Sequence, residues 1–140
     1  MCRTGLLRFL VCTVSAVLMF SCARPDSREV FILKDKAEGG VYQYALDLSD
    51  TLCTYDFWFY SRVDGPRSES LQLNVFWVSP SGELFSETVH MSPCGREGSK
   101  ELYRSSLVPS EPGEWTLRVR PTDTPKGFRG LGLIYRRNEN

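Results

Sequence analysis

The 140-residue chain contains one histidine, His90, and this limits the chemistry that its side chains can perform. A catalytic triad or a histidine-rich metal site needs further partners at matching spacing, and the sequence offers none. Asp47, Asp50 and Asp56 could in principle form a glycosidase pair or a calcium site, but each also fits a turn or a solvent-facing position. The sequence also lacks zinc-type spacings, phosphate loops and nucleophile elbows. We therefore predict a protein that is not an enzyme and holds no metal and no cofactor.

The clearest chemical signal surrounds Cys22. Met1–Arg8 is short and basic, and Phe9–Phe20 is apolar apart from three residues, which is the layout of a secretory signal. The apolar run has twelve residues, fewer than the ~20 that a bilayer-spanning helix needs. Ser21-Cys22 directly follows the run and resembles the lipobox that lipoprotein signal peptidase cuts in bacteria. An ordinary secretory signal and an uncleaved anchor helix are the alternatives.

The lipobox resemblance implies that Cys22 becomes the first mature residue and carries diacylglycerol and an N-acyl chain. Two or three acyl chains hold a protein durably on a membrane, whereas a single chain binds marginally. Residues 23–27 lack an aspartate at the second mature position and the run of acids that marks surface-exported lipoproteins. We therefore expect a lipid-anchored protein of the outer membrane that faces the periplasm, with surface exposure left open. The chain then divides into a signal peptide (1–21), a lipidated tether (22–28) and a domain (29–140).

Cys53 and Cys94 are the two cysteines that remain in the mature domain. In an oxidising periplasm they could form one disulfide, which would stabilise the fold by roughly 3–4 kcal/mol on the chain-entropy model. They could instead be separate thiols, because Cys53 shares a strand face with aromatic residues and Cys94 falls in a predicted loop. Nothing in the sequence places their Cα atoms within ~7 Å, so we favour two unpaired thiols.

The charge balance argues against a nucleic-acid partner. Basic and acidic residues number seventeen each, which gives a formal net charge of zero. Arg3 and Arg8 belong to the signal, so the remaining chain has fifteen basic against seventeen acidic residues, a net charge of −2 (15 − 17). Proteins that bind nucleic acids usually carry a basic excess.

From residue 29 onward, short segments of alternating polarity are separated by turn residues, and no segment has a convincing helical period. Glu114–Arg120 is the clearest strand, because its apolar and polar residues alternate between two prolines. Leu71–Ser79 and Glu83–Met91 share the turn Ser79-Pro80-Ser81-Gly82 and predict a hairpin. The other predicted strands are Glu29–Lys34, Val41–Leu48, Cys53–Arg62, Glu101–Val108 and Phe128–Arg136. Eight such strands predict a single all-β domain that is either a β-sandwich or an open barrel. Of the two we expect an antiparallel β-sandwich of the immunoglobulin-like or jelly-roll-like kind.

Aromatic residues are abundant and offer a possible binding surface. Trp77 and Trp115 occupy the apolar phases of their strands and are expected in the core. Trp58 and Tyr60 alternate with the core-facing residues of Cys53–Arg62 and are the candidate ligand contacts on the outer face of the domain. The alternative, which we favour for the aromatic residues as a set, is that they belong to the core. The sequence does not decide whether Tyr42 and Tyr44 lie on the core face or the outer face of their strand. Arg118 and Arg120 are expected to be exposed, on a solvated sheet face or an edge strand.

The order of these features resembles a known family. A lipoprotein signal is followed by an aromatic strand, then by the strand–Ser-Pro-Ser-Gly–strand run of Leu71–Glu83 and by Leu102-Tyr103. Pro112-Gly113-Glu114-Trp115-Thr116 and the closing Gly130-Leu131-Gly132-Leu133 complete the pattern. It is similar to the gliding-motility lipoprotein H (GldH) family of Bacteroidetes over nearly all of the mature chain. The resemblance implies a β-sandwich lipoprotein linked to gliding and to the secretion apparatus of the cell envelope, in a family that also occurs in bacteria that do not glide.

The combined hypothesis is a non-enzymatic lipoprotein, tethered to the outer membrane through Cys22, that acts as a scaffold or accessory of a cell-envelope complex. Its expected partners are the membrane and other envelope proteins. The alternative is a β-sandwich module that binds a glycan or a peptide through an exposed aromatic strip around Trp58 and Tyr60. Burial of those two rings separates the alternatives, because a ligand platform must face solvent.

Overall fold

The computed structural model describes residues 26–65, 70–92 and 100–139. Cys22, Cys94 and the expected signal peptide lie outside the described residues. The described chain forms eight β-strands and two short 3₁₀ helices, so the all-β prediction is confirmed. The strands are β1 (Ser27–Leu33), β2 (Tyr42–Asp47), β3 (Thr54–Val63), β4 (Leu71–Val78), β5 (Leu84–Met91), β6 (Glu101–Leu107), β7 (Glu114–Pro121) and β8 (Phe128–Asn138). Each corresponds to a predicted strand, with ends that differ by at most two residues.

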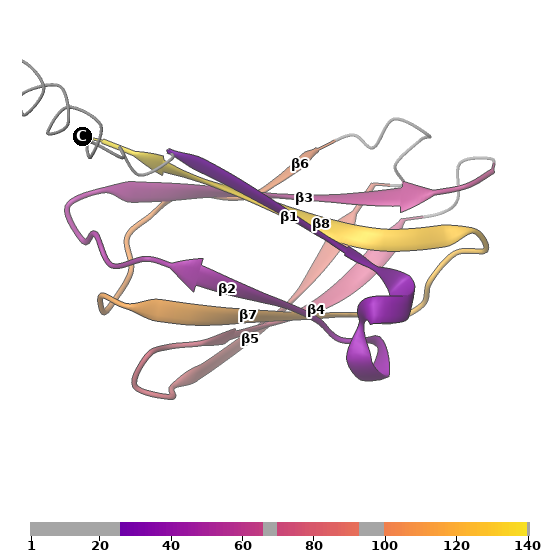
Figure 1. Ribbon diagram of the computed structural model, residues 1–140, viewed down its shortest axis with the longest axis horizontal. Coiled ribbons are helices and arrows are strands. Elements are labelled where there is room, and N and C mark those ends of the chain that lie inside the picture. Colours follow the sequence, from indigo (N-terminus) through magenta and orange to yellow (C-terminus); the bar gives the residue numbers. More distant parts are fainter. Residues whose placement is uncertain (1–25, 66–69, 93–99, 140) are drawn as a thin grey trace, which may run out of the picture.

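The strands build two antiparallel sheets that pack face to face (Figure 1). One sheet has the order β1-β8-β3-β6 and the other the order β2-β7-β4-β5. The chain crosses from the first sheet to the second through η1 (Lys34–Lys36) and η2 (Glu38–Gly40). β5 and β6 are edge strands on one side of the sandwich, and β1 and β2 are the edge strands on the other. The single antiparallel β-sandwich is thus confirmed.

Strict alternation places one face of each sheet in the core. In β7, Trp115, Leu117 and Val119 are buried, whereas Glu114, Arg118 and Arg120 are exposed. Burying such a side chain stabilises a fold by about 1.5–3 kcal/mol, so two facing rows of them supply the main driving force for packing. The aromatic strand β3 lies between β8 and β6, as its composition indicated.

Tyr42 and Tyr44 belong to this core, with 2% and 1% of their surface exposed. The Tyr44 hydroxyl donates a 2.8 Å hydrogen bond across the sandwich to the carbonyl of Leu131, which satisfies the one polar atom of the side chain. β7 is an interior strand, so Arg118 and Arg120 line a solvated sheet face and do not guard an edge.

The predicted hairpin between β4 and β5 is present. The Ser79 N–H donates to the Glu83 carbonyl and the Gly82 N–H to the Ser79 carbonyl, both at 2.9 Å. Gly82 has a φ of 91°, a conformation that glycine adopts without steric cost. This hairpin tip lies at the same end of the sandwich as the loops 48–53 and 108–113, the start of β1 and the end of β8 (Figure 1). We call this end, where β1 begins, the tether end.

Candidate functional site

A cleft opens at the tether end, between the edge strands β5 and β6. It has a volume of about 450 Å³ and lies between the two sheets. Its lining is mainly apolar and consists of Leu48, Trp77, Phe85, Ser86, Glu87, Arg104, Leu107, Val108, Pro109, Ser110 and Trp115. Clefts of this volume, apolar with a few polar groups, are typical of small-ligand and side-chain binding sites.

Two tryptophans form the inner surface of the cleft. Trp77 and Trp115 are 7% and 6% exposed and meet edge to face, with ring centroids 6.2 Å apart. Phe85 stacks against Trp115 at 6.4 Å and is 48% exposed, so its ring forms the outer wall. The Trp115 Nε1 donates to the Glu111 carbonyl at 3.1 Å, which fixes the indole plane. The prediction that Trp77 and Trp115 point inward is confirmed, but their edges remain accessible from the cleft.

A polar chain across β5 and β6 closes one side of the cleft. The Trp77 Nε1 donates a 2.8 Å hydrogen bond to the Tyr103 hydroxyl, which in turn donates to the Glu87 carboxylate. Arg104 donates to the other oxygen of Glu87 at 2.5 Å. Burial by itself would raise the pKa of Glu87, but the bonds from Arg104 and Tyr103 outweigh it, so the pKa lies below its usual value. Burial raises the pKa of Tyr103, and the bond to Glu87 adds to that shift, so the hydroxyl stays a donor.

The wall formed by β6 depends on an irregular backbone. The pairing of β6 with β3 shifts register on both sides of Phe57, as in a β-bulge. Ser106 in this stretch has a φ of 53°, the one positive φ among described non-glycine residues. Its N–H bonds at 2.8 Å to Asp56, whose carboxylate also accepts bonds from Arg136 and Asn138. The Ser106 N–H contributes most to lowering the pKa of Asp56, followed by the bonds from Asn138 and Arg136. Bulges of this kind redirect side chains near binding sites, and here Leu107 and Val108 line the cleft.

The β4–β5 hairpin is joined to the loop that follows β6. The Glu111 carboxylate accepts the Ser81 N–H at 2.6 Å and the Ser81 hydroxyl at 2.9 Å, and the first of these bonds is the main reason its pKa is lowered. Gly113 lies against the same hairpin, where a Cβ atom would come within 2.9 Å of the Pro80 ring. These contacts fix the distance between the outer walls of the cleft.

The structure places the candidate contacts Trp58 and Tyr60 on the outer face of β3, away from the cleft. Tyr60 is only 4% exposed, because Phe31 of β1 stacks on it at 5.6 Å and its hydroxyl donates to Glu29 at 2.6 Å. Trp58 is half-buried, with the Arg136 guanidinium 5.1 Å above its ring. The outer face of β3 therefore presents no open row of rings, and the exposed strip suggested by alternation is wrong for Tyr60.

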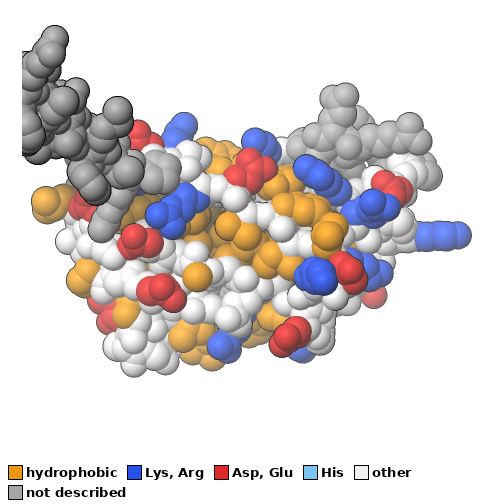
Figure 2. Space-filling model, in the orientation of Figure 1, with side chains coloured by type: hydrophobic (Ala, Val, Ile, Leu, Met, Phe, Trp, Pro, Cys, Tyr) orange, Lys and Arg blue, Asp and Glu red, His pale blue; other side chains and the backbone are white. Residues whose placement is uncertain are grey.

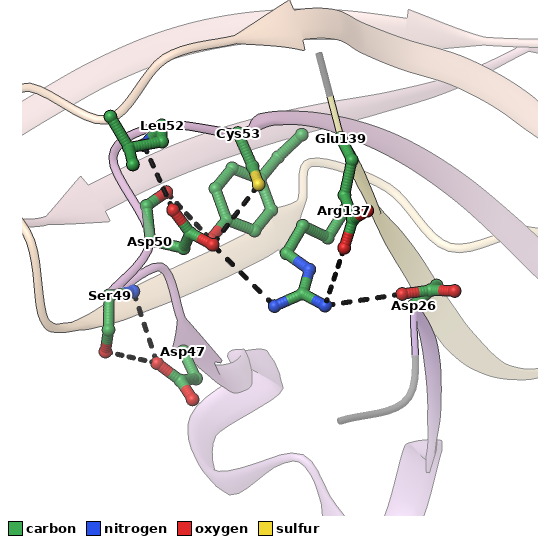
Figure 3. Close-up of polar contacts among 9 residues, drawn as sticks. Asp26, Asp47, Ser49, Asp50, Leu52, Cys53, Arg137 and Glu139 are labelled. Atoms are coloured by element: carbon green, nitrogen blue, oxygen red, sulfur yellow. Dashed lines mark hydrogen bonds and ion pairs between the residues drawn. The ribbon is translucent and has the colours of Figure 1, made fainter. Parts of the chain in front are cut away.

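A second polar cluster joins the first and last strands at the tether end (Figure 3). Arg137 of β8 pairs with Asp26 at 3.4 Å and Asp50 at 3.8 Å, and with Glu139 at 3.7 Å. Asp50 also accepts a 3.2 Å hydrogen bond from the Cys53 thiol. That bond, followed by burial, raises the pKa of Cys53. Cys53 is a buried free thiol in this structure, while Cys94 lies outside the described residues.

The cleft is lined by few charged groups. Its one carboxylate and one guanidinium are engaged with each other, and His90 lies exposed on β5 away from the cleft. Within the described ranges, no three histidine, cysteine, aspartate or glutamate side chains gather in a way that could hold a metal ion. Nor does any helix there have the length and hydropathy to cross a bilayer.

The sequence contained part of the signal for the cleft. Trp77, Phe85 and Trp115 lie on adjacent strands, and their registers bring Phe85 opposite Trp77. Sequence patterns could not reveal that the core is left uncovered between β5 and β6 at the tether end. Comparisons of the chain with protein-family models and with curated proteins found no match.

Proposed function

We propose that this protein is a lipid-anchored, non-enzymatic accessory or scaffold of a cell-envelope complex, and that it contacts its partner through the cleft between β5 and β6. The cleft itself is the observation that carries this proposal. It combines accessible tryptophan edges with a polar closure, which are the features of a site that binds an apolar group and fixes its orientation. The anchor rests on the lipobox-like Ser21-Cys22.

The surroundings of the cleft support binding over catalysis. A general acid or base needs a titratable group that can exchange a proton with a bound substrate. Glu87 is held in its charged form by Arg104, and Tyr103 is held protonated by burial and by its bond to Glu87. These groups stabilise the shape of the site and leave recognition to the apolar walls.

The rigid walls also support recognition of a defined shape. The β4–β5 hairpin is bonded to the loop after β6 through Glu111, and the bulge in β6 is held by Asp56. A site whose walls are fixed before binding loses little conformational entropy when a ligand enters. Association with gliding or secretion proteins and a periplasm-facing position on the outer membrane are the expectations that the GldH resemblance adds.

A cleft-filling variant tests the proposal in cells. The gene is deleted and complemented with the native chain, with Ser110→Trp, whose new ring would occupy the cleft, or with Ser105→Trp as the matched control outside it. We expect the deletion to change the level of at least one envelope protein or secreted cargo. The native chain and Ser105→Trp should restore it, while Ser110→Trp should not. Unchanged envelope proteins and cargo after deletion would remove the scaffold role.

The lipid anchor is tested separately in the same cells. Labelling with a fatty-acid analogue should mark the native chain and not Cys22→Ser. A labelled Cys22→Ser protein would contradict the anchor. If Ser110→Trp restores function fully while Cys22→Ser does not, the anchor stands and the cleft is not the partner surface.

A glycan or an extended peptide is the second candidate ligand. The three aromatic rings of the cleft make the cleft a better binding surface for it than the covered outer face of β3. Sugar rings and apolar side chains both stack on indole surfaces. Titration of tryptophan emission with cell-wall glycan fragments or with peptides should show saturation in the native protein and in Ser105→Trp, and none in Ser110→Trp. Equal responses of the two variants would contradict binding in the cleft.

A further inference from the structure

Exposed apolar side chains gather at the tether end. Seven large hydrophobic residues are exposed in the described structure, and four of them lie on the loops or strand starts at this end. They are Leu52 (83% exposed), Leu84 (63%), Phe85 (48%) and Val108 (60%), which we call the tether-end patch. Figure 2 shows hydrophobic side chains projecting at the end where β8 stops. Single exposed hydrophobics are ordinary, but several together at one end indicate a contact surface.

The chain length before β1 identifies the surface that this patch can reach. Four peptide steps join Cys22 to Asp26, the first described residue, so their Cα atoms are at most about 14 Å apart in any conformation. The ten-residue strand β3 alone is about 33 Å long, so the opposite end of the sandwich lies well beyond that reach. If Cys22 is held in the bilayer, the tether end is the part of the domain that remains beside the headgroups.

The charges at the tether end indicate which headgroup charge a contacting membrane surface would have. Among the described residues, carboxylates outnumber cations there: Asp26, Asp47, Asp50, Asp56, Glu83, Glu111, Glu114 and Glu139 compared with Arg28, Arg136 and Arg137. An acidic surface is repelled by anionic lipid headgroups and is not attracted to them. Contact with a bilayer would therefore depend on burial of apolar side chains at a zwitterionic surface.

We propose that the tether-end patch is a membrane-contacting surface, with Leu52, Leu84, Phe85 and Val108 inserted into the interfacial layer of the bilayer that holds Cys22. This inference rests on the lipid anchor in the proposed function. The domain then stands with its strands rising from the membrane and the cleft opening beside the lipid surface. Apolar side chains buried to the depth of the headgroup boundary are how peripheral proteins supplement a lipid anchor.

Quenching of tryptophan emission by lipid tests the contact. The full lipidated chain is reconstituted into phosphatidylcholine vesicles with either plain or brominated acyl chains. Trp115 stacks on Phe85 of the patch, so we expect bromination to reduce the summed emission of the three tryptophans through Trp115. Leu52→Asp/Val108→Asp should abolish the reduction. Leu33→Asp/Leu102→Asp, at exposed sites (45% and 54%) outside the tether end, should retain it. Replacing part of the lipid with anionic phosphatidylglycerol should weaken the quenching.

Flotation of the same vesicles separates failure of the contact from failure of the anchor. A native chain that floats but is not quenched overturns the contact and leaves the anchor intact, whereas a chain that does not float overturns both. An equal loss of quenching in the two double variants also overturns the proposal. So does a result in which Leu52→Asp/Val108→Asp changes only the oligomeric state of the protein in detergent. If the aspartate pair lowers the melting temperature, Leu52→Ser/Val108→Ser replaces it.

Discussion

The backbone N–H of Ser106 donates a 2.8 Å hydrogen bond to the carboxylate of Asp56, a residue fifty positions earlier in the chain. This bond holds Ser106 at a φ of 53° and allows β6 to leave its regular pairing with β3. The pairing with β3 resumes at Leu107, the last residue of β6, whose side chain lines the cleft. One carboxylate on a neighbouring strand thus helps to shape the proposed binding site.

Removing that carboxylate should destabilise the domain. Asp56 is 8% exposed, and Asp56→Ala leaves the Ser106 N–H without its acceptor and removes the carboxylate that pairs with Arg136. We expect a loss of about 2–3 kcal/mol in the free energy of unfolding, measured by urea denaturation at pH 7. The matched control is Asp64→Ala, which removes an exposed ion pair with Arg129 and should cost less than about 1 kcal/mol. Equal losses in the two variants would contradict the structural role of Asp56.

Replacing Ser106 with glycine should change the stability in the opposite direction from Asp56→Ala. A residue with a side chain is strained in the left-handed region, whereas glycine is not. Ser106→Gly should therefore leave stability unchanged or raise it by up to about 1 kcal/mol, and Ser106→Val should lower it by about 1–2 kcal/mol. Thermal unfolding of both variants beside the native protein is the measurement. A valine that is tolerated as well as glycine would show that the positive φ is not maintained in solution.

Gly132 should be essential for the burial of Tyr60. A Cβ atom at position 132 would lie 2.1 Å from the Tyr60 ring, so Gly132→Ala must displace the ring and its stacking on Phe31. We expect a loss of about 1–3 kcal/mol. In a Tyr60→Ala background the added methyl group has space, and the same substitution should cost almost nothing. A double-mutant cycle by chemical denaturation measures this coupling, and additive losses would contradict it.

Glu87 should make the stability depend on pH. Its pKa in the folded protein is lowered, so at acidic pH the unfolded chain binds the proton more readily than the folded chain. The stabilisation is present above the unfolded pKa of about 4.3 and is lost as the pH falls through the folded value. Glu87→Gln should cost about 1 kcal/mol at pH 7 and progressively less below pH ~4. Urea denaturation of both proteins across this range tests it, and a constant difference at all pH values would exclude titration of Glu87.

The positions of the strands could be predicted because alternation is a local property. In β7 the spacing of Trp115, Leu117 and Val119 by two residues, between turn-forming prolines, determines both the strand and its buried face. The same reasoning divided β3 correctly into a core face and an outer face. It also placed Trp77 and Trp115 inward, so the core of the domain was largely predictable.

Whether each outer-face and cleft residue is exposed or covered was not predictable, because this depends on strands that are distant in sequence. Tyr60 occupies an outward phase, yet Phe31 of β1 covers it and Gly132 of β8 leaves room beneath its ring. Trp77 occupies an inward phase, yet the bulged strand β6 leaves its edge accessible. Alternation specifies the side of a sheet on which a residue lies, but not whether another element covers it.

The sequence by itself determined the all-β class, the eight strands and their buried faces, because each of these follows from contacts within a strand or a turn. It also supplied the lipobox-like motif at Cys22 and the few residues between that motif and the domain. The tertiary structure decided the sheet order, the cleft beside Trp77 and Trp115, and the gathering of Leu52, Leu84, Phe85 and Val108 at the tether end. These features arise where segments far apart in the chain meet, and packing of the two sheets alone brings them together.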